Sequence, residues 1–140
     1  MSLVDVEALV SQYLRAQSEV TAYVAQRVYT SLPADPTFPC VRIVRVGGAP
    51  KMSRPLYVDS AHLQIDVFGG SKATTFDTID AIRQELAKMV DEDPVQPLGV
   101  VCGVKFGPLA YIADESYSPA KPRYAQDVTV TVRPAPLPTT

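Results

Sequence analysis

Ala-His-Leu-Gln-Ile-Asp-Val-Phe, residues 61–68, is the stretch that decides the fold. Apolar residues occupy every second position, and the positions between them are mostly polar. Because side chains of a strand point alternately to its two faces, this pattern predicts a strand with one buried face. Gly69-Gly70 ends the strand and separates it from a segment of helical periodicity.

That segment predicts a long one-sided helix over about residues 74–91, with Thr74 or Thr75 as the N-cap. Its apolar stripe is Phe76, Ile79, Ile82, Leu86, Met89 and Val90. Two shorter helices are predicted upstream, one over residues 6–14 and one from Ser18 with a stripe that runs to Val28.

Three more strands are predicted, at Cys40–Val46, Gly99–Phe106 and Tyr124–Arg133. The order α-α-β-β-α-β-β, without an internal repeat, predicts the α+β class in a single domain. We expect a mostly antiparallel four-stranded sheet with helices packed on one face over residues 1–133. Residues 134–140 are predicted to form a Pro-rich extended tail.

The connection between the first two predicted strands, residues 47–60, is long for a hairpin. Long connections in small domains are often functional. We therefore predict that it contacts a neighbouring subunit or another protein. The residues proposed for this contact are Lys51, Met52, Arg54, Leu56 and Tyr57.

A polar sheet face is the second candidate surface. The alternation of the strands places it opposite the face that helices should cover. Its predicted members are His62, Gln64, Asp66, Asp127, Thr129 and Thr131. Such a face can meet water, line a wet cavity or lumen, or abut another subunit.

No catalytic or metal-binding motif emerges from the residue types. His62 is the only histidine, and a triad with Ser60 and Asp66 is not expected, because successive residues on one face of a strand lie about 7 Å apart. Cys40 and Cys102 are too few for a disulfide framework, and we expect both thiols to be buried. No cofactor and no metal is predicted.

The overall charge is mildly acidic, with a formal net charge of −2 and a pI near 5.3. A nucleic-acid-binding domain normally shows a basic excess, so specific nucleic-acid binding is not expected. No apolar run approaches the roughly 20 residues that span a bilayer, and no secretory signal is evident. We expect a protein made in the cytoplasm, with no membrane partner.

Several segments carry a recognisable combination of packing and turn residues. They are the run Val20–Tyr29, Leu32-Pro33, Phe38-Pro39, the strand Leu63–Phe68, the helix residues Ile79, Ile82, Arg83 and Leu86, the turn Pro122-Arg123-Tyr124 and the strand Val128–Arg133. Together, over about residues 18–133, they resemble the tail terminator (tail completion) proteins of long-tailed bacteriophages.

The resemblance implies a structural virion protein made in the host bacterial cytoplasm and located at the head-proximal end of the tail. Six copies would form a ring that caps the tail tube, stops its polymerisation and provides the surface for the head connector. DNA would pass through the pore without specific binding, and no catalytic residue or cofactor is implied. The alternatives are another head–tail connector, neck or minor tail protein, or a small ligand-binding or enzymatic domain that uses the His62 face.

Overall fold

The structure, a computed structural model, describes residues 3–53 and 56–134. Its elements follow the order α-α-β-β-β-α-β-β-β. They are α1 (Val6–Arg15), α2 (Ser18–Val24), β1 (Val28–Tyr29), β2 (Cys40–Ser53), β3 (Leu56–Phe68), α3 (Lys72–Glu92), β4 (Val95–Gln96), β5 (Gly99–Tyr111) and β6 (Arg123–Arg133).

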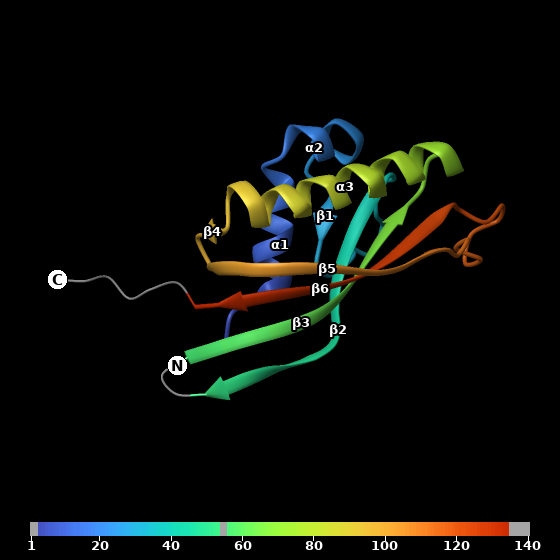
Figure 1. The fold of residues 1–140 in the computed structure, drawn as a ribbon. Helices are drawn as coiled ribbons and strands as arrows, with labels where there is room; N and C mark the ends of the chain where they lie inside the picture. Colours follow the sequence, from blue (N-terminus) through green and yellow to red (C-terminus); the bar gives the residue numbers. More distant parts are fainter. Residues whose placement is uncertain (1–2, 54–55, 135–140) are drawn as a thin grey trace.

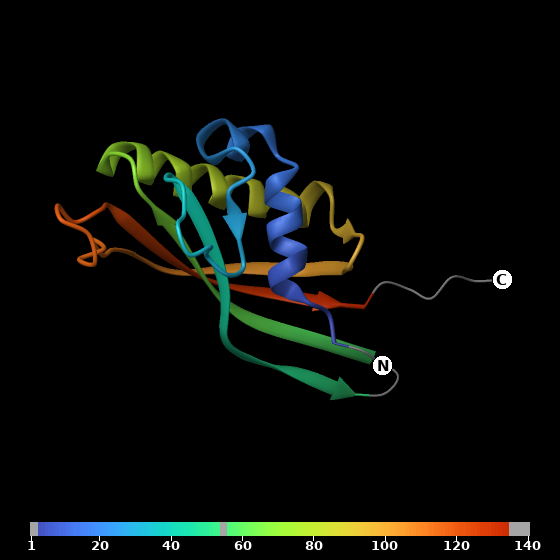
Figure 2. The same ribbon diagram turned by 180° about the vertical axis from the view of Figure 1, so that it is seen from behind.

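The sheet has six strands in the order β1-β2-β3-β6-β5-β4, and it curls towards a half-barrel (Figures 1 and 2). β1 runs parallel to β2, whereas all other neighbouring strands are antiparallel. The expectation of a four-stranded, mostly antiparallel sheet is therefore wrong. The additional strands, β1 and β4, have two residues each and are too short to show alternation. Val28, predicted on a helix stripe, lies in β1.

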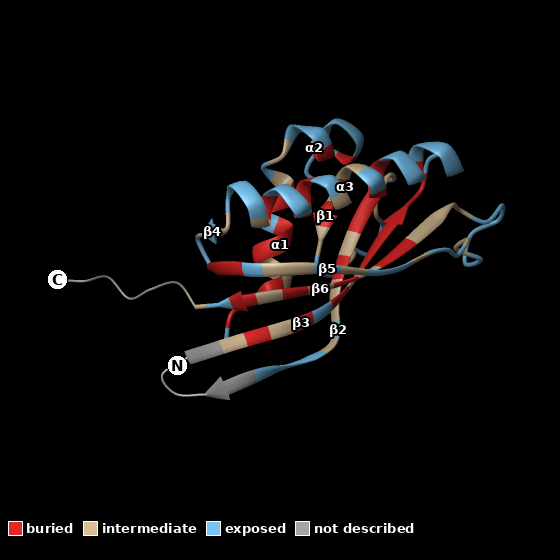
Figure 3. Ribbon diagram, viewed as in Figure 1, coloured by how far each residue is buried: buried red, intermediate tan, exposed pale blue. Residues whose placement is uncertain are grey.

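All three helices lie on one side of the sheet, and the core is between them and the sheet (Figures 1 and 3). The residues that are fully or almost fully buried there include Leu9, Leu14, Ile43, Leu63, Ile65, Ile79, Ile82, Leu86, Met89 and Val130. Apolar residues 61, 63, 65 and 67 of β3 all face this core, as their alternation predicts.

α3 begins earlier than predicted because Ser71, rather than Thr74 or Thr75, caps it. The Ser71 hydroxyl accepts a hydrogen bond from the Thr74 backbone N–H at 3.1 Å. Thr75 is buried inside the first turns, and its hydroxyl donates to the Gly69 and Ser71 carbonyls. The Thr75 hydroxyl thus does not cap the helix but bonds back to the preceding backbone.

The predicted long connection, residues 47–60, is instead the far half of a β-hairpin. β2 and β3 stay paired from Cys40 opposite Phe68 to Ser53 opposite Leu56. A bulge at Val46 shifts the register, and Gly48 follows it at φ +86°. A Cβ at Gly48 would lie 2.0 Å from the Ser60 carbonyl oxygen, so only glycine fits. The glycine pair therefore bends the strand rather than ending it.

Two smaller expectations have different outcomes. Cys40 is buried as predicted, but Cys102 is exposed, and it lies at the register shift of β5 between Val101 and Gly103, where the regular alternation is interrupted. Within residues 3–53 and 56–134, no helix is long and apolar enough to cross a membrane. The predicted tail beyond Pro134 lies outside the described residues.

Candidate assembly surfaces

The far half of the β2–β3 hairpin, which we call the arm (residues 47–60), extends away from α2 and α3 (Figure 1). Four of the predicted contact residues lie in its paired strands near the tip: Lys51 pairs with Val58, Met52 with Tyr57, and Leu56 with Ser53. The fifth, Arg54, lies outside the described residues. The predicted contact segment is therefore the end of a two-stranded ribbon.

A buried ion pair fixes the root of the arm. Asp59 has no exposed surface, and both of its carboxylate oxygens accept hydrogen bonds from Arg45, at 2.6 and 2.8 Å. The Arg45 backbone N–H in turn donates to Glu7 of α1 at 2.6 Å. Bidentate Arg–carboxylate pairs are strong and geometrically specific, so these contacts fix the arm relative to α1.

Sequence reasoning missed this pair, although one signal was present. Asp59 follows the same every-second-position pattern as Ala61 and Leu63, so it faces the helix side of the sheet. A carboxylate on an apolar face needs a partner, and Arg45 of β2 is that partner.

The structure brings the predicted polar face together, on the side of the sheet away from the helices. His62 pairs with Thr129, and Gln64 pairs with Asp127. The Ser60 and Thr131 hydroxyls lie 3.2 Å apart and share a hydrogen bond. His62 is exposed, and the strand pairing surrounds it with hydroxyl groups rather than with an acid–base partner.

Asp66 behaves differently from the rest of this face. It has no exposed surface and accepts hydrogen bonds from Arg42 at 2.7 Å and from Arg123 at 3.0 Å. Gln64 donates to it at 3.0 Å, and both guanidinium groups also lie over the Phe68 ring. Asp66 is therefore an internal counter-ion for two arginines and presents no free charge to a lumen or a neighbour.

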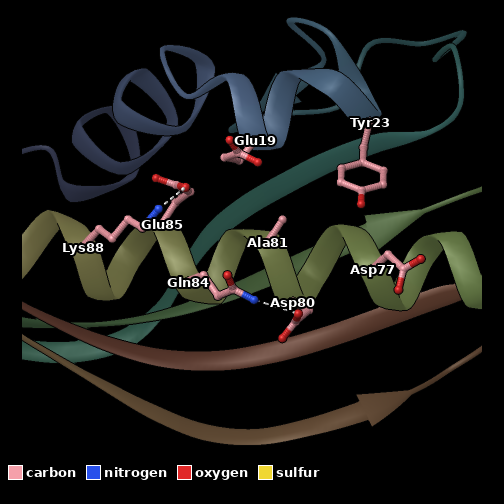
Figure 4. A pocket seen from close by; sticks show the side chains of 8 residues that line it. All are labelled: Glu19, Tyr23, Asp77, Asp80, Ala81, Gln84, Glu85 and Lys88. Carbon is pink, nitrogen blue, oxygen red and sulfur yellow. Dashed lines mark hydrogen bonds and ion pairs between the residues drawn. The ribbon is translucent and has the colours of Figure 1, made fainter.

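An acidic groove lies between α2 and α3 on the helical side of the molecule (Figure 4). Glu19 and Tyr23 of α2 line it together with Asp77, Asp80 and Glu85 of α3, and Glu85 points towards Glu19.

Among the described residues that line this groove, Lys88 is the cation, and its Nζ lies 3.4 Å from the Glu85 carboxylate. Near it, burial and then the carboxylates of Glu85, Asp93 and Glu92 raise the pKa of Tyr13. The groove presents mainly negative charge.

In the described part of the chain, no three His, Cys, Asp or Glu side chains are grouped so that they could hold a metal ion.

The loop between β5 and β6 contains a carboxyl group with a shifted pKa, that of Asp114. The Ser116 hydroxyl donates to Asp114, and this bond, aided by the Ser116 backbone N–H and by Arg123, lowers the pKa of Asp114. The bond organises a turn rather than a reactive centre.

Comparisons with known proteins point to one group. The family model described as tail completion protein gp17 matches residues 8–115. The fold matches a chain in a solved structure titled "Virion of native gene transfer agent (GTA) particle", with a TM-score of 0.72 and 22% sequence identity. That match covers 91% of this chain and 93% of the other chain, and it shows the shared fold. No curated protein sequence matches the chain significantly.

Proposed function

Because this chain belongs to the tail completion protein gp17 family, we propose that it closes the phage tail as a terminator ring. The family assignment makes the chain a structural tail protein with its place in the virion tail. The match over residues 8–115, most of the chain, is the observation that carries the proposal. The proposed ring contains six copies, caps the finished tube and stops its polymerisation.

The proposed partners follow from that position. One side of the ring contacts the tail tube protein, and the other provides the surface for the head connector. Each copy contacts the next through two different patches, because cyclic symmetry with more than two copies requires a heterologous interface. DNA passes through the pore without specific binding.

The arm is the proposed contact element. A two-stranded ribbon that extends from the body can reach a neighbouring subunit or the tube end, and the Arg45–Asp59 pair fixes its direction. Lys51, Met52, Arg54, Leu56 and Tyr57 remain the residues proposed for the contact.

The polar face is proposed to face the lumen. A basic lumen would retard the genome, since each neutralised phosphate adds affinity through counterion release. His62, Gln64, Asp127, Thr129 and Thr131 provide the polar groups of this face, and the two arginines beside them are paired with Asp66. Asp66 is no longer part of this proposal as a free charge, because it is buried between two arginines. The alternative is that the face packs against the adjacent subunit.

We propose that the chain has no enzymatic activity and needs no cofactor. As the family's proteins are structural, binding between subunits is the expected chemistry. Substitution of His62 by Ala should then leave tail function intact. A folded His62→Ala variant without function would reverse this part of the proposal.

A complementation experiment tests the proposed function. A phage that lacks this gene should make tails of uncontrolled length, and the wild-type chain should restore a single length in electron micrographs. A variant without residues 49–56 should fold but leave tail length uncontrolled. Normal-length tails that fail to join heads in the deletion phage would instead indicate a connector, and normal virions would overturn the proposal.

A further inference from the structure

The charges at the ends of α3 are reversed relative to its dipole. A helix carries partial positive charge at its N-terminus and negative charge at its C-terminus, so acids stabilise the first turn and bases the last. α3 begins with Lys72 and has no acid in its first turn. It ends with Asp91 and Glu92, has no base in its last turn, and is followed by Asp93. This arrangement destabilises an isolated chain.

The N-terminal end of α3 belongs to a surface that we call the aromatic–cationic end. There, the Lys72 amine lies 4.4 Å from the centre of the Tyr111 ring. Lys121 lies 4.6 Å from the centre of the Phe38 ring and 5.2 Å from that of Tyr117. The Gly69 N–H donates to the Pro122 carbonyl, which brings the Lys121 loop close to the start of α3.

Exposed apolar groups accompany these cations. Phe76 is 45% exposed, Tyr111 40%, Ile112 49% and Tyr117 36%. Phe76 and Tyr111 both pack edge-on against Tyr124. Aromatic residues are enriched at protein interfaces, where they provide most of the binding energy. The cluster therefore has the composition of a contact surface rather than of an ordinary solvent-exposed end.

The opposite end of α3, which we call the acidic end, combines carboxylates with aliphatic groups. Asp91, Glu92 and Asp93 are exposed, and Val95 and Leu98 follow at 66% and 39% exposure. The 21 residues of α3 separate the two ends by about 31 Å. The ends are thus distinct surfaces that one neighbour on each side could cover.

We propose that the aromatic–cationic end of one copy docks on the acidic end of the next copy. In this contact, opposite charges and exposed apolar groups would meet, and the α3 dipoles would align head to tail. The lysines at the start of one α3 would then face the carboxylates at the end of the next. The contact uses two different patches, as a ring requires. This inference rests on the proposed function, because it describes the contact within the ring.

Docking through side chains is favoured over extension of the sheet from copy to copy. The two long strands nearest the sheet edges, β2 and β5, each contain a proline and a bulge. Pro50 lies in β2 and Pro108 in β5, and neither can donate a backbone hydrogen bond. Prolines and bulges at sheet edges are devices that prevent strand addition.

A reciprocal charge exchange tests the contact by complementation. One variant carries Lys72→Glu and Lys121→Glu, and the other carries Asp91→Lys and Asp93→Lys. Each alone places like charges at every contact and should reduce the yield of normal-length tails at least tenfold. Both expressed together restore opposite charges in an alternating ring, and the yield should return to within about threefold of wild type. A Glu19→Lys variant, which reverses a charge elsewhere on the molecule, should act as wild type.

Thermal unfolding of the purified variants is the control that shows whether each variant still folds. Asp91→Lys with Asp93→Lys should raise Tm by roughly 1–4 °C, because the helix end then carries the favourable charge. If a charge exchange unfolds the chain, Lys72→Gln with Lys121→Gln and Asp91→Asn with Asp93→Asn replace it, each with an expected loss of about threefold or more.

Two results would overturn the contact. The first is that each folded single-end variant alone gives tails of normal length. The second is that each variant lowers the yield of normal-length tails and that co-expression of the two variants does not restore this yield. Failure of the wild-type chain to control tail length is a different result, because it rejects the terminator function itself.

Discussion

On one face of β3, Ala61, Leu63, Ile65 and Val67 are fully buried beneath the helices, whereas the other face carries polar residues. From Ala61 to Val67, the first face is stabilised by apolar burial. The second reaches the same degree of burial at Asp66, but through two arginines that also cover the Phe68 ring. One strand thus combines a non-directional core with a directional ion cluster.

The difference teaches which face can tolerate change. An apolar core accepts side chains of similar volume, because burial depends on area and packing rather than on direction. The ion cluster has no such tolerance, since removal of one member leaves a charge without its partner. Exposed residues of the same polar face, such as His62, belong to neither system and should be the most tolerant.

The largest expected effect lies on the core face. Leu63→Ala should lower the free energy of unfolding by about 2–5 kcal/mol, because it removes buried methyl groups and leaves a cavity beneath the helices. Urea unfolding followed by circular dichroism measures this change. A loss below about 1 kcal/mol would mean that the helices do not pack on Leu63.

A smaller but sharper effect is expected on the polar face. Asp66→Asn keeps the size of the side chain but removes the counter-ion of Arg42 and Arg123. The expected loss is about 2–3 kcal/mol, less than for a fully buried pair, since both arginines are partly exposed.

The control for this change is His62→Ala, which lies four residues earlier in β3 on the same face of the sheet. His62 is exposed, so its removal should change the free energy of unfolding by less than about 0.5 kcal/mol. Equal effects of the two substitutions would show that Asp66 has no special structural role.

The sequence predicts the core face well, because periodicity encodes it directly. The alternation at residues 61–68 and 128–132 and the helical stripe at 79, 82, 86 and 89 correspond to buried residues. Two members of the predicted stripe differ, because Phe76 is 45% exposed and Val90 is only partly buried. It does not predict β1 and β4, since two-residue strands exist only through pairing with a neighbour. It also misplaces the arm, because Gly47-Gly48 can end a strand or bend it, and only the partner strand decides which.

The candidate surfaces are less predictable for a related reason. The members of the polar face follow from alternation, but the burial of Asp66 depends on Arg42 and Arg123, which lie 24 and 57 residues away in sequence. The aromatic–cationic end likewise combines residues from several distant segments. No local pattern reports such long-range contacts, although Asp59 on an apolar face signals that one must exist.

The bend that separates the arm from the helix-covered part of the sheet gives the next prediction. Gly48→Ala should cost about 1–2 kcal/mol, because its φ of +86° is unfavourable for alanine and the Cβ would meet the Ser60 carbonyl. Gly47→Ala is the matched control: its Cβ would lie 3.8 Å from the His62 Cβ, an ordinary contact. Equal stabilities of the two variants in urea would show that the strand does not bend at Gly48.

The smallest expected effect concerns acid, which should act on the loop between β5 and β6. The folded pKa of Asp114 is lowered, chiefly by the Ser116 hydroxyl, so its contribution to stability is present above the unfolded value of about 3.9. That contribution is lost as the pH falls through the lower, folded pKa. Ser116→Ala removes the main donor and should move the pKa of Asp114 up towards its ordinary value. NMR titration of the aspartate carboxyl groups measures this shift, and Ser118→Ala in the same loop should leave it unchanged. An Asp114 that titrates at its ordinary value in the wild-type chain would show that the loop is not held by this bond, and the Ser116 substitution would then have no effect on acid stability.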